Sequence, residues 1–290
     1  METKLTSATK EVIISSERST VLIGERINPT GKKKLTKALQ NGDPGFVRKE
    51  ALAQVEAGAD VLDINVGALG VDEVGLLPQV VQIVMDTVDV PLCLDSANPM
   101  ALEGALKVYR GKPLVNSVNG QERSLKKILP LIKGYGAAVI GLTMDDKGIP
   151  DDVDQRVAIA YKIVENAEAM GIPRRDVIID CLALAVGANT KTGLVVIEAI
   201  RRVKAELRVN LTLGVSNISF GLPDRNLLNS TFITIAITMG VNCPIVDVAK
   251  MRPAILAADL ILDHDRYAMR YIKAYQQRQS EGKQAKPSSE

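Results

Sequence analysis

Four polar residues stand out because each of them ends a short, mostly apolar run. They are two carboxylic acids and two carboxamides: Asp95 in PLCLD, Asn116 in PLVN, Asp180 in VIID and Asn217 in LTLGVSN. Carboxylates accept hydrogen bonds and carboxamides both donate and accept, so this set suits the edge of a flat heterocycle with alternating N–H and C=O groups. A phosphate ligand would favour Lys, Arg and glycine-rich backbone amides, which are scarce at these positions. The residue types indicate a site for a small heterocyclic ligand.

Other polar residues occupy comparable places, where an apolar run gives way to a helical stretch. They are Glu25, Asp63, Asn65, Ser96, Ser117, Ser219 and Asp247. Any single Asp, Asn or Ser at such a junction is more often a helix cap than part of a site. For the three serines, capping and ligand binding therefore both remain open.

The elements that must position these residues are runs rich in Val, Ile and Leu that alternate with stretches of helical spacing. Eight strands are predicted, at residues 20–25, 60–67, 90–96, 112–117, 137–143, 176–182, 210–217 and 243–248. The helical stretches include residues 37–58 and a last amphipathic helix at roughly 252–275. Nearly continuous apolar strands that alternate with helices predict an α/β protein with a (β/α)8 TIM barrel. An open doubly wound sheet is the alternative, because periodicity does not show closure.

A closed barrel would bring the polar set together, because active sites of this architecture lie at the C-terminal ends of the strands. Residues 1–275 are predicted to form a single TIM-barrel domain. The tail at 276–290 is polar and poor in apolar residues, so we expect it to be disordered.

Composition excludes several classes of partner. The 36 basic and 34 acidic residues nearly cancel, and the chain has no Trp, 3 Phe and 6 Tyr. A nucleic-acid partner is not expected, because little is available for charge attraction or base stacking. No apolar run approaches the roughly 20 residues that a membrane-spanning helix needs, and the first residues lack the apolar centre of a secretory signal. We therefore expect no membrane association and a cytoplasmic location.

Seven blocks, taken in order, resemble the pterin-binding methyltransferase family. The blocks are IGERINPTG, GADVLDINVGA, PLCLDSANP, LVNSVNG, AAVIGLTMDDKGIP, IIDCLA and LGVSNISFGLPDR, and they cover roughly residues 21–248. This family includes methyltetrahydrofolate:corrinoid protein methyltransferases and is similar to the folate domain of cobalamin-dependent methionine synthase. The resemblance implies a barrel that exchanges a methyl group between tetrahydrofolate, or its 5-methyl form, and a cobalt corrinoid held by a partner protein. It also implies a homodimer.

The resemblance implies a role for each matching residue. Asp95, Asn116 and Asp180 correspond to residues that hold the pterin ring, and Asn217 to the amide beside the pterin N5. The amide of Asn217 would orient N5 and stabilise charge that appears in the transition state, which makes it the predicted catalytic residue. Weaker correspondences add three further residues to the predicted binding set, which are Asn65, Ser219 and Arg225. Arg225 would face the aminobenzoyl-glutamate side of the folate.

Several functions remain open at this point. We favour transfer from a methylcorrinoid to tetrahydrofolate, as in O-demethylase or methylamine and betaine demethylation systems. The opposite direction, from methyltetrahydrofolate to a corrinoid iron-sulfur protein of acetyl-CoA synthesis, is an alternative. Dihydropteroate synthase shares the barrel but should carry a basic cluster for diphosphate, and only Lys250 and Arg252 follow the last predicted strand. A non-catalytic folate-binding module is the remaining alternative.

Histidine and cysteine carry no predicted chemistry. The single histidine, His264, is expected on the last helix, away from every strand end, so a histidine-based triad is not expected. The three cysteines, Cys93, Cys181 and Cys243, are widely separated in the chain. We interpret them as buried thiols and predict no metal site, because zinc-binding cysteines usually include a clustered pair.

Overall fold

A parallel sheet of eight strands forms the centre of the molecule in this computed structural model, which describes residues 1–284. In spatial order the strands are β10 (Ile245–Val246), β3 (Ile23–Ile27), β4 (Val61–Ile64), β5 (Leu92–Asp95), β6 (Leu114–Asn119), β7 (Ala138–Leu142), β8 (Val177–Asp180) and β9 (Asn210–Thr212). The two edges meet through a bridge between Gly214 and Ile245, where the Ile245 amide donates to Leu213 O at 2.9 Å. This closure confirms the predicted barrel.

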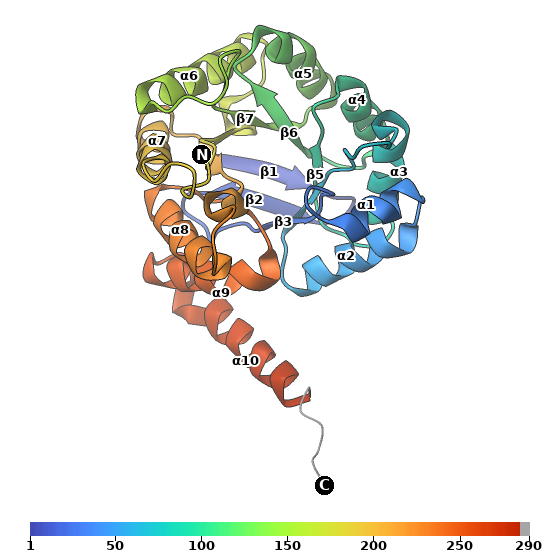
Figure 1. Ribbon diagram of the computed structural model, residues 1–290, viewed down its shortest axis with the longest axis vertical. Helices are drawn as coiled ribbons and strands as arrows, with labels where there is room; N and C mark the ends of the chain where they lie inside the picture. The colour runs from blue at the N-terminus through green and yellow to red at the C-terminus, as the bar shows by residue number, and fades with distance from the viewer. Residues whose placement is uncertain (285–290) are drawn as a thin grey trace.

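Helices surround the barrel as an outer ring (Figure 1). They are α1 (Lys33–Gln40), α2 (Pro44–Glu56), α3 (Glu73–Met85), α4 (Pro99–Val108), α5 (Glu122–Tyr135), α6 (Val153–Ala169), α7 (Thr192–Leu207), α8 (Arg225–Met239) and α9 (Val248–Ile261). The last helix, α10 (Met269–Gln284), projects away from the ring (Figure 1). Within residues 1–284, no helix combines the length and the apolar character needed to cross a membrane.

The interior of the barrel is divided into an apolar layer and a polar layer. The apolar layer includes Ile23, Val61, Cys93, Leu114 and Ile178, which pack in one buried cluster. Side chains two residues apart on a strand point to the same face, so the next inward position on each of these strands lies one layer closer to the C-terminal ends. Those positions hold four carboxylic acids and one carboxamide, which are Glu25, Asp63, Asp95, Asn116 and Asp180. The strand period thus places five of the predicted rim residues in one layer.

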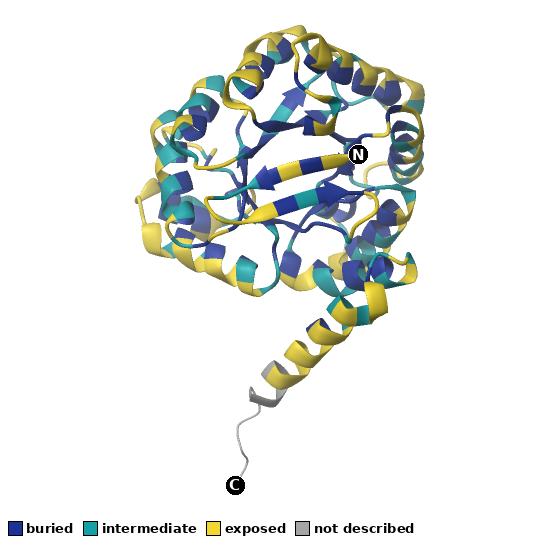
Figure 2. Ribbon diagram, turned by 180° about the vertical axis from the view of Figure 1, so that it is seen from behind, coloured by how far each residue is buried: buried dark blue, intermediate teal, exposed yellow. Residues whose placement is uncertain are grey.

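A hairpin that the sequence analysis did not predict closes the opposite end of the barrel. Strands β1 (Glu2–Thr6) and β2 (Glu11–Ser15) pair antiparallel, and Figure 2 shows them lying across that end. Leu5, Val12 and Ile14 of the hairpin pack in the same cluster as the apolar layer. Asn210, at the start of β9, donates its side-chain amide to Ile14 O at 3.0 Å. The hairpin therefore forms the floor of the barrel.

The structure has two helices, α1 and α2, where the sequence predicts a single helix at 37–58. Helix α1 ends before Gly42, which adopts a positive φ of 63°. Asp43 then caps α2 by accepting from the Gly45 amide at 2.9 Å, and Pro44 occupies the first position of that helix. Gly, Asp and Pro each favour this break, and together they end one helix and begin the next.

The predicted helix at 252–275 is also two helices, α9 and α10. Helix α9 ends at Ile261, and Asp263 adopts a positive φ of 62° that is incompatible with a continuous helix. Asp265 then accepts from the amides of Arg270 and Tyr271 at 3.0 and 2.8 Å, which satisfies the start of α10. His264 consequently lies between the two helices and not on the last one.

One strand boundary also differs from expectation. The strand expected at 210–217 ends at Thr212, and its last residues form a 3-10 turn, η2 (Val215–Ser219). Helix α10 extends to Gln284 and so enters the tail at 276–290 that we expected to be disordered. Residues 285–290 lie outside the described part of the chain, so the expected domain boundary stays a prediction.

Candidate functional site

A network of acids and amides links the ends of strands β4, β5 and β6. Asp95 and Asn116 are neighbours in the register of β5 and β6. Asn65 donates its side-chain amide to Asp95 Oδ2 at 2.9 Å, and Asn116 donates to Asp63 Oδ1 at 3.3 Å. Three predicted site residues are thus brought together, with Asp63 as a fourth member that the predicted binding set did not include.

The two acids of this network are difficult to ionise. Burial raises the pKa of Asp63 well above its ordinary value, and the nearby charge of Asp95 raises it further. Burial also raises the pKa of Asp95 to about 6, although the hydrogen bond from Asn65 opposes the shift. Two carboxylates this close in a buried site disfavour double ionisation. The pair can therefore offer both a hydrogen-bond acceptor and a protonated oxygen that donates.

Asp180, at the end of β8, is connected to the turn that carries Asn217. Its Oδ1 accepts from the Leu182 amide at 2.6 Å, and the carboxylate also accepts from the backbone amide of Gly214. Burial raises the pKa of Asp180 to about 6, against the opposing effect of these bonds and of Arg156. The acid is therefore fixed in position, and its pKa lies near 6.

Arg156, on α6, stabilises the backbone that follows Asp180. No sequence signal had identified this residue. Its guanidinium is fully buried and donates from Nη1 to Cys181 O at 2.6 Å and to Leu182 O at 2.8 Å. These carbonyls follow Asp180 directly, at a point where Leu182 has a positive φ of 60°. Arg156 thus holds the turn after β8 in shape.

Asn217 lies on the exposed side of the η2 turn, at the C-terminal end of the barrel. Its side chain makes no hydrogen bond to any residue in 1–284. Both the side-chain NH2 group and the side-chain carbonyl oxygen are therefore available to a ligand. Gly214 makes room for it, because a Cβ atom at that position would lie 3.1 Å from Asn217 Nδ2. The turn therefore presents a free carboxamide next to Gly214, whose backbone amide is bonded to Asp180.

Ser219 and Arg225 stabilise this same turn. Arg225 donates from Nε to Ser219 Oγ at 3.0 Å and from Nη2 to Ser216 O at 2.6 Å, and Ser219 is fully buried. The structure therefore brings both residues to the site, where their hydrogen bonds stabilise the loop around Asn217. Their predicted contacts with a ligand remain predictions.

Ser96 is occupied by contacts typical of a helix cap. Its hydroxyl donates to Glu73 Oε1 at 2.6 Å and accepts from the Asn98 amide at 2.9 Å. Asn98 in turn caps α4 through its side chain. These contacts favour the capping interpretation that the sequence left open for this serine.

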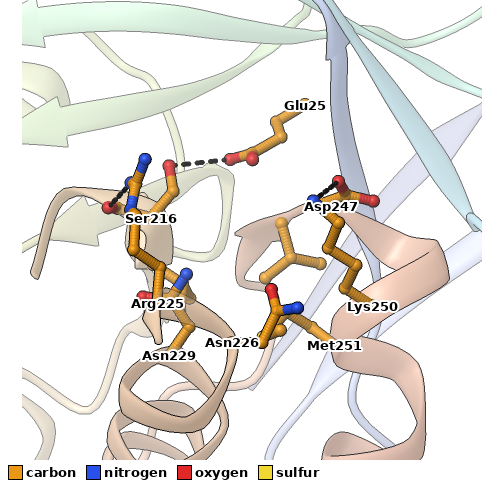
Figure 3. A pocket seen from close by; sticks show the side chains of 10 residues that line it. Glu25, Ser216, Arg225, Asn226, Asn229, Asp247, Lys250 and Met251 are labelled. Carbon is orange, nitrogen blue, oxygen red and sulfur yellow. Dashed lines mark hydrogen bonds and ion pairs between the residues drawn. The ribbon is translucent and has the colours of Figure 1, made fainter. Parts of the chain in front are cut away.

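A cavity of about 130 Å³ opens beside the barrel mouth, between η2 and the first turns of α8 and α9 (Figure 3). Arg225 is the member of the predicted set that lines it. The other lining residues are Glu25, Val215, Ser216, Asn226, Asn229, Val246, Asp247, Lys250 and Met251. Glu25 and Asp247 had been placed on the rim by the sequence analysis, whereas Ser216 had not been singled out. Its position directly before Asn217 was a signal that could have identified it.

The charges around this cavity are largely paired, with Glu25 as an exception. Asp247 lies 3.2 Å from Lys250 Nζ and 3.6 Å from Arg26 Nη1, and Arg26 Nε also donates to Glu50 at 3.2 Å. Glu25 has no cation within 4.0 Å among the described residues and accepts from Ser216 Oγ at 3.2 Å, a bond drawn in Figure 3. Burial raises the pKa of Glu25, while Lys32 and the Ser216 bond lower it.

Metal and thiol chemistry have no assembled site in the part of the chain that is described. No group of three or more His, Cys, Asp or Glu side chains there could hold a metal ion. The three cysteines are buried and free, as predicted, and burial raises the pKa of Cys181 and Cys243. Protonated buried thiols are poor nucleophiles.

Comparison with known proteins adds independent evidence. A sequence model of the family described as "Pterin binding enzyme" matches residues 24–247. The chain is 33% identical over 267 residues to a methylcorrinoid:tetrahydrofolate methyltransferase of Eubacterium limosum, covering 89% of this chain and 96% of that protein. It is 30% identical over 265 residues to the methionine synthase of Mycobacterium leprae (strain TN), covering 87% of this chain but 22% of the synthase.

Similar solved structures support the fold. One is a Yersinia pestis dihydropteroate synthase with a pterine-sulfa conjugate, at a TM-score of 0.70 and 18% identity over 90% of this chain and 99% of that one. Another is the dihydropteroate synthase of Xanthomonas albilineans in complex with 7,8-dihydropteroate, at a TM-score of 0.70 and 20% identity with the same coverage. At these identities the likeness concerns the barrel alone.

Proposed function

Because this chain belongs to the family of pterin-binding enzymes, we propose that it is a methyltransferase acting between a protein-bound cobalt corrinoid and N5 of tetrahydrofolate. The relative from Eubacterium limosum, which the chain matches over nearly its whole length, is named a methylcorrinoid:tetrahydrofolate methyltransferase, and this name supports the proposal. The structural observation that carries the proposal is the free carboxamide of Asn217 on a turn joined to Asp180. The direction that we favour is from the methylcorrinoid to tetrahydrofolate.

The ring would be held by Asp95, Asn116 and Asp180. A pterin edge presents an amino group, a ring N–H and a carbonyl oxygen, so it needs both acceptors and donors. Asp180 accepts at neutral pH because most of it is ionised above its pKa of about 6. Asn116 supplies an amide that can donate or accept, and Asn65 orients Asp95 through its hydrogen bond. The binding energy of the ring fixes N5 relative to the incoming methyl group.

The methyl transfer itself needs no protein nucleophile. In the favoured direction, the N5 lone pair attacks the methyl carbon of the corrinoid substrate, and the electrons of the cobalt–carbon bond remain on cobalt. N5 gains positive charge and must lose its proton. The Asn217 amide is neither a strong acid nor a strong base, but it can orient N5 and stabilise the charge that develops only in the transition state. The corrinoid would be delivered by a partner protein, and a homodimer remains a prediction.

Dihydropteroate synthase activity is less compatible with the site. A diphosphate-binding site needs available cations, but Lys250 is paired with Asp247, and Arg225 is engaged by Ser216 and Ser219. Two carboxylates, Glu25 and Asp247, line the same cavity and would repel a diphosphate.

The deciding experiment mixes the protein with methylcobalamin and tetrahydrofolate and follows the cobalt spectrum. We expect demethylation that requires both compounds and yields 5-methyltetrahydrofolate. Absence of transfer, even with corrinoid partner proteins supplied, would refute the enzyme assignment. Condensation of a pterin diphosphate with aminobenzoate would support dihydropteroate synthase instead.

Substitution of Asn217 separates catalysis from binding. In Asn217→Ala we expect kcat to fall about 100-fold, as when a single transition-state hydrogen bond is removed, while tetrahydrofolate affinity changes little. Asn166→Ala, an exposed position on α6, serves as the matched control. A non-catalytic folate carrier would lose affinity or show no change, and would have no turnover in either protein.

A further inference from the structure

Glu25 on β3 and Ser216 in the η2 turn, 191 residues apart in the chain, meet at the barrel mouth, where Ser216 Oγ donates to Glu25 Oε2 at 3.2 Å (Figure 3). Ser216 belongs to the same short turn as Asn217. We propose that Glu25 takes up the proton that N5 of tetrahydrofolate loses on methylation, and that the Ser216 hydroxyl relays it. This inference rests on the proposed methyl transfer and assigns the proton acceptor of that reaction.

The proton transfer balances without any further reactant. As the N5–carbon bond forms and the cobalt–carbon bond breaks, N5 becomes a tertiary ammonium that still bears its proton. The Ser216 oxygen accepts this proton while the Ser216 hydroxyl proton passes to Glu25 Oε2. The product is neutral 5-methyltetrahydrofolate and a protonated Glu25. In the opposite direction, the same pair would return the proton to N5.

The other acids at the mouth are less suited to this role. Asp95 is held by Asn65, and Asp180 accepts from two backbone amides, so both are engaged in positions assigned to the ring. Asp247 is neutralised by Lys250 and Arg26. Glu25 has no cation within 4.0 Å among residues 1–284, and it borders a cavity of about 130 Å³ that can admit water. A proton could leave Glu25 for solvent through that cavity.

The charged groups that face Glu25 set its proton affinity. Lys32, from the loop after β3, lowers the pKa of Glu25, as does Arg26 on β3 itself, while Asp247 at the start of α9 raises it. Asp63 on β4 is close enough to interact with Glu25 electrostatically. Lys32 donates to the backbone oxygens of Glu25 and Arg26, at 2.9 and 3.2 Å, and not to the carboxylate. Burial dominates, and the pKa of Glu25 lies above its ordinary value.

The test measures kcat for methyl transfer from methylcobalamin to tetrahydrofolate as a function of pH, in ordinary water and in deuterated water. In the wild-type protein we expect the rate to rise with pH as Glu25 ionises, because only the carboxylate accepts a proton. In Glu25→Gln we expect a loss of about 100-fold in kcat, the size typical of one general base, with that pH dependence and its solvent isotope effect abolished. KM for tetrahydrofolate should stay within about 3-fold, since the ring-binding residues are intact.

A second pair of variants tests the relay without altering the acid. Ser216→Ala should reproduce the loss in kcat, and Ser216→Thr, which keeps a hydroxyl, should restore most of it. Glu122→Gln on α5, an exposed carboxylate far along the ring of helices, is the matched control. If Glu25→Gln fails to fold, the contrast between Ala and Thr at position 216 decides the proposal.

Each remaining outcome is decisive. An unchanged pH profile in Glu25→Gln overturns the proposal, and so does a selective rise in KM for tetrahydrofolate, which would make Glu25 a binding residue. Equal loss in Ser216→Ala and Ser216→Thr excludes the relay through the hydroxyl. If the wild-type protein transfers no methyl group, the proposed function fails first and this inference fails with it. The wild-type assay alone detects this failure, so it is distinguished from a failure of the proton-transfer proposal, which requires the variants.

Discussion

At the residue scale, the buried charge of Asp180 in the candidate site lowers the stability of the fold. Its folded-state pKa is about 6 and its ordinary value is 3.8, so burial makes the ionised form costly. Between these two pH values the folded chain binds more protons at this position than the unfolded chain does. The free energy of unfolding therefore falls as pH rises through this window, and the full cost is present above about pH 6.

Replacement of this acid by its amide should therefore stabilise the protein while weakening binding. The shift corresponds to about 3 kcal/mol at neutral pH, and Asn gives up about 1 kcal/mol by losing one of the two backbone hydrogen bonds. We expect Asp180→Asn to raise the free energy of unfolding by about 1–2 kcal/mol at about pH 7.5, with tetrahydrofolate affinity lowered about 10-fold. Urea denaturation and fluorescence titration measure the two quantities.

The pH dependence distinguishes this explanation from a general packing effect. Below the ordinary pKa of aspartate the advantage of Asp180→Asn should disappear, because the wild-type acid is then protonated in both states. Asp146→Asn, at an exposed loop position, should change neither quantity. A stabilisation that is equal at acidic and neutral pH would contradict the electrostatic explanation.

Some residues of the site were accessible from sequence and others were not. Asp95, Asn116 and Asp180 follow apolar runs, and the strand period alone places them inward at the C-terminal end. The contact of Ser216 with Glu25 and the support of the Asp180 turn by Arg156 depend on how loops pack after the barrel closes. No local pattern encodes such contacts, so sequence reasoning missed them.

At the scale of elements, the η2 turn is the part that determines where Asn217 lies. The expected strand at 210–217 stops early, and the following turn is fixed by Arg225 and by the bond from Gly214 to Asp180. Apolar residues in the LTLGVSN run suggested a longer strand, because buried apolar side chains occur both in the strand and in the 3-10 turn that follows it. The site therefore relies on a turn that the apolar pattern did not predict.

Gly214→Ala should perturb this turn selectively. The φ of Gly214 is −77°, which alanine tolerates, but the new methyl group would lie 3.1 Å from Asn217 Nδ2 and would force that side chain to move. We expect kcat to fall about 10-fold, with the free energy of unfolding changed by less than about 1 kcal/mol. Steady-state kinetics and urea denaturation test both expectations.

Gly134→Ala is the matched control for this substitution. Gly134 lies in α5, and a Cβ added there would meet no atom within 4 Å beyond the neighbouring backbone of its own helix. Alanine there should leave kcat unchanged and add about 0.5–1 kcal/mol of stability through its higher helix propensity. If both alanine variants kept full activity, the placement of Asn217 by Gly214 would be wrong.

At the scale of the whole molecule, the apolar floor and the candidate site lie at opposite ends of the barrel. Nearly continuous apolar runs predicted eight strands and hence the barrel, whereas the strands of the β1–β2 hairpin are five residues each and alternate buried with exposed positions, so a search for continuous apolar runs passed over them. The hairpin fills the floor with Leu5, Val12 and Ile14. The acids lie at the other end, where the strands finish. This division is the one that TIM barrels generally show.

Truncation of a floor side chain should therefore affect stability and leave the chemistry intact. Leu5 and Ile14 are fully buried, and Leu5→Ala or Ile14→Ala should each lower the free energy of unfolding by about 2–5 kcal/mol through lost burial and a residual cavity. Leu194→Ala, which removes a side chain that is 73% exposed, should cost less than about 0.5 kcal/mol. At a temperature where all three variants are folded, kcat and KM for tetrahydrofolate should match the wild-type values. A selective rise in KM in the floor variants would mean that the hairpin influences the mouth through the barrel interior, and the two ends would then not be independent.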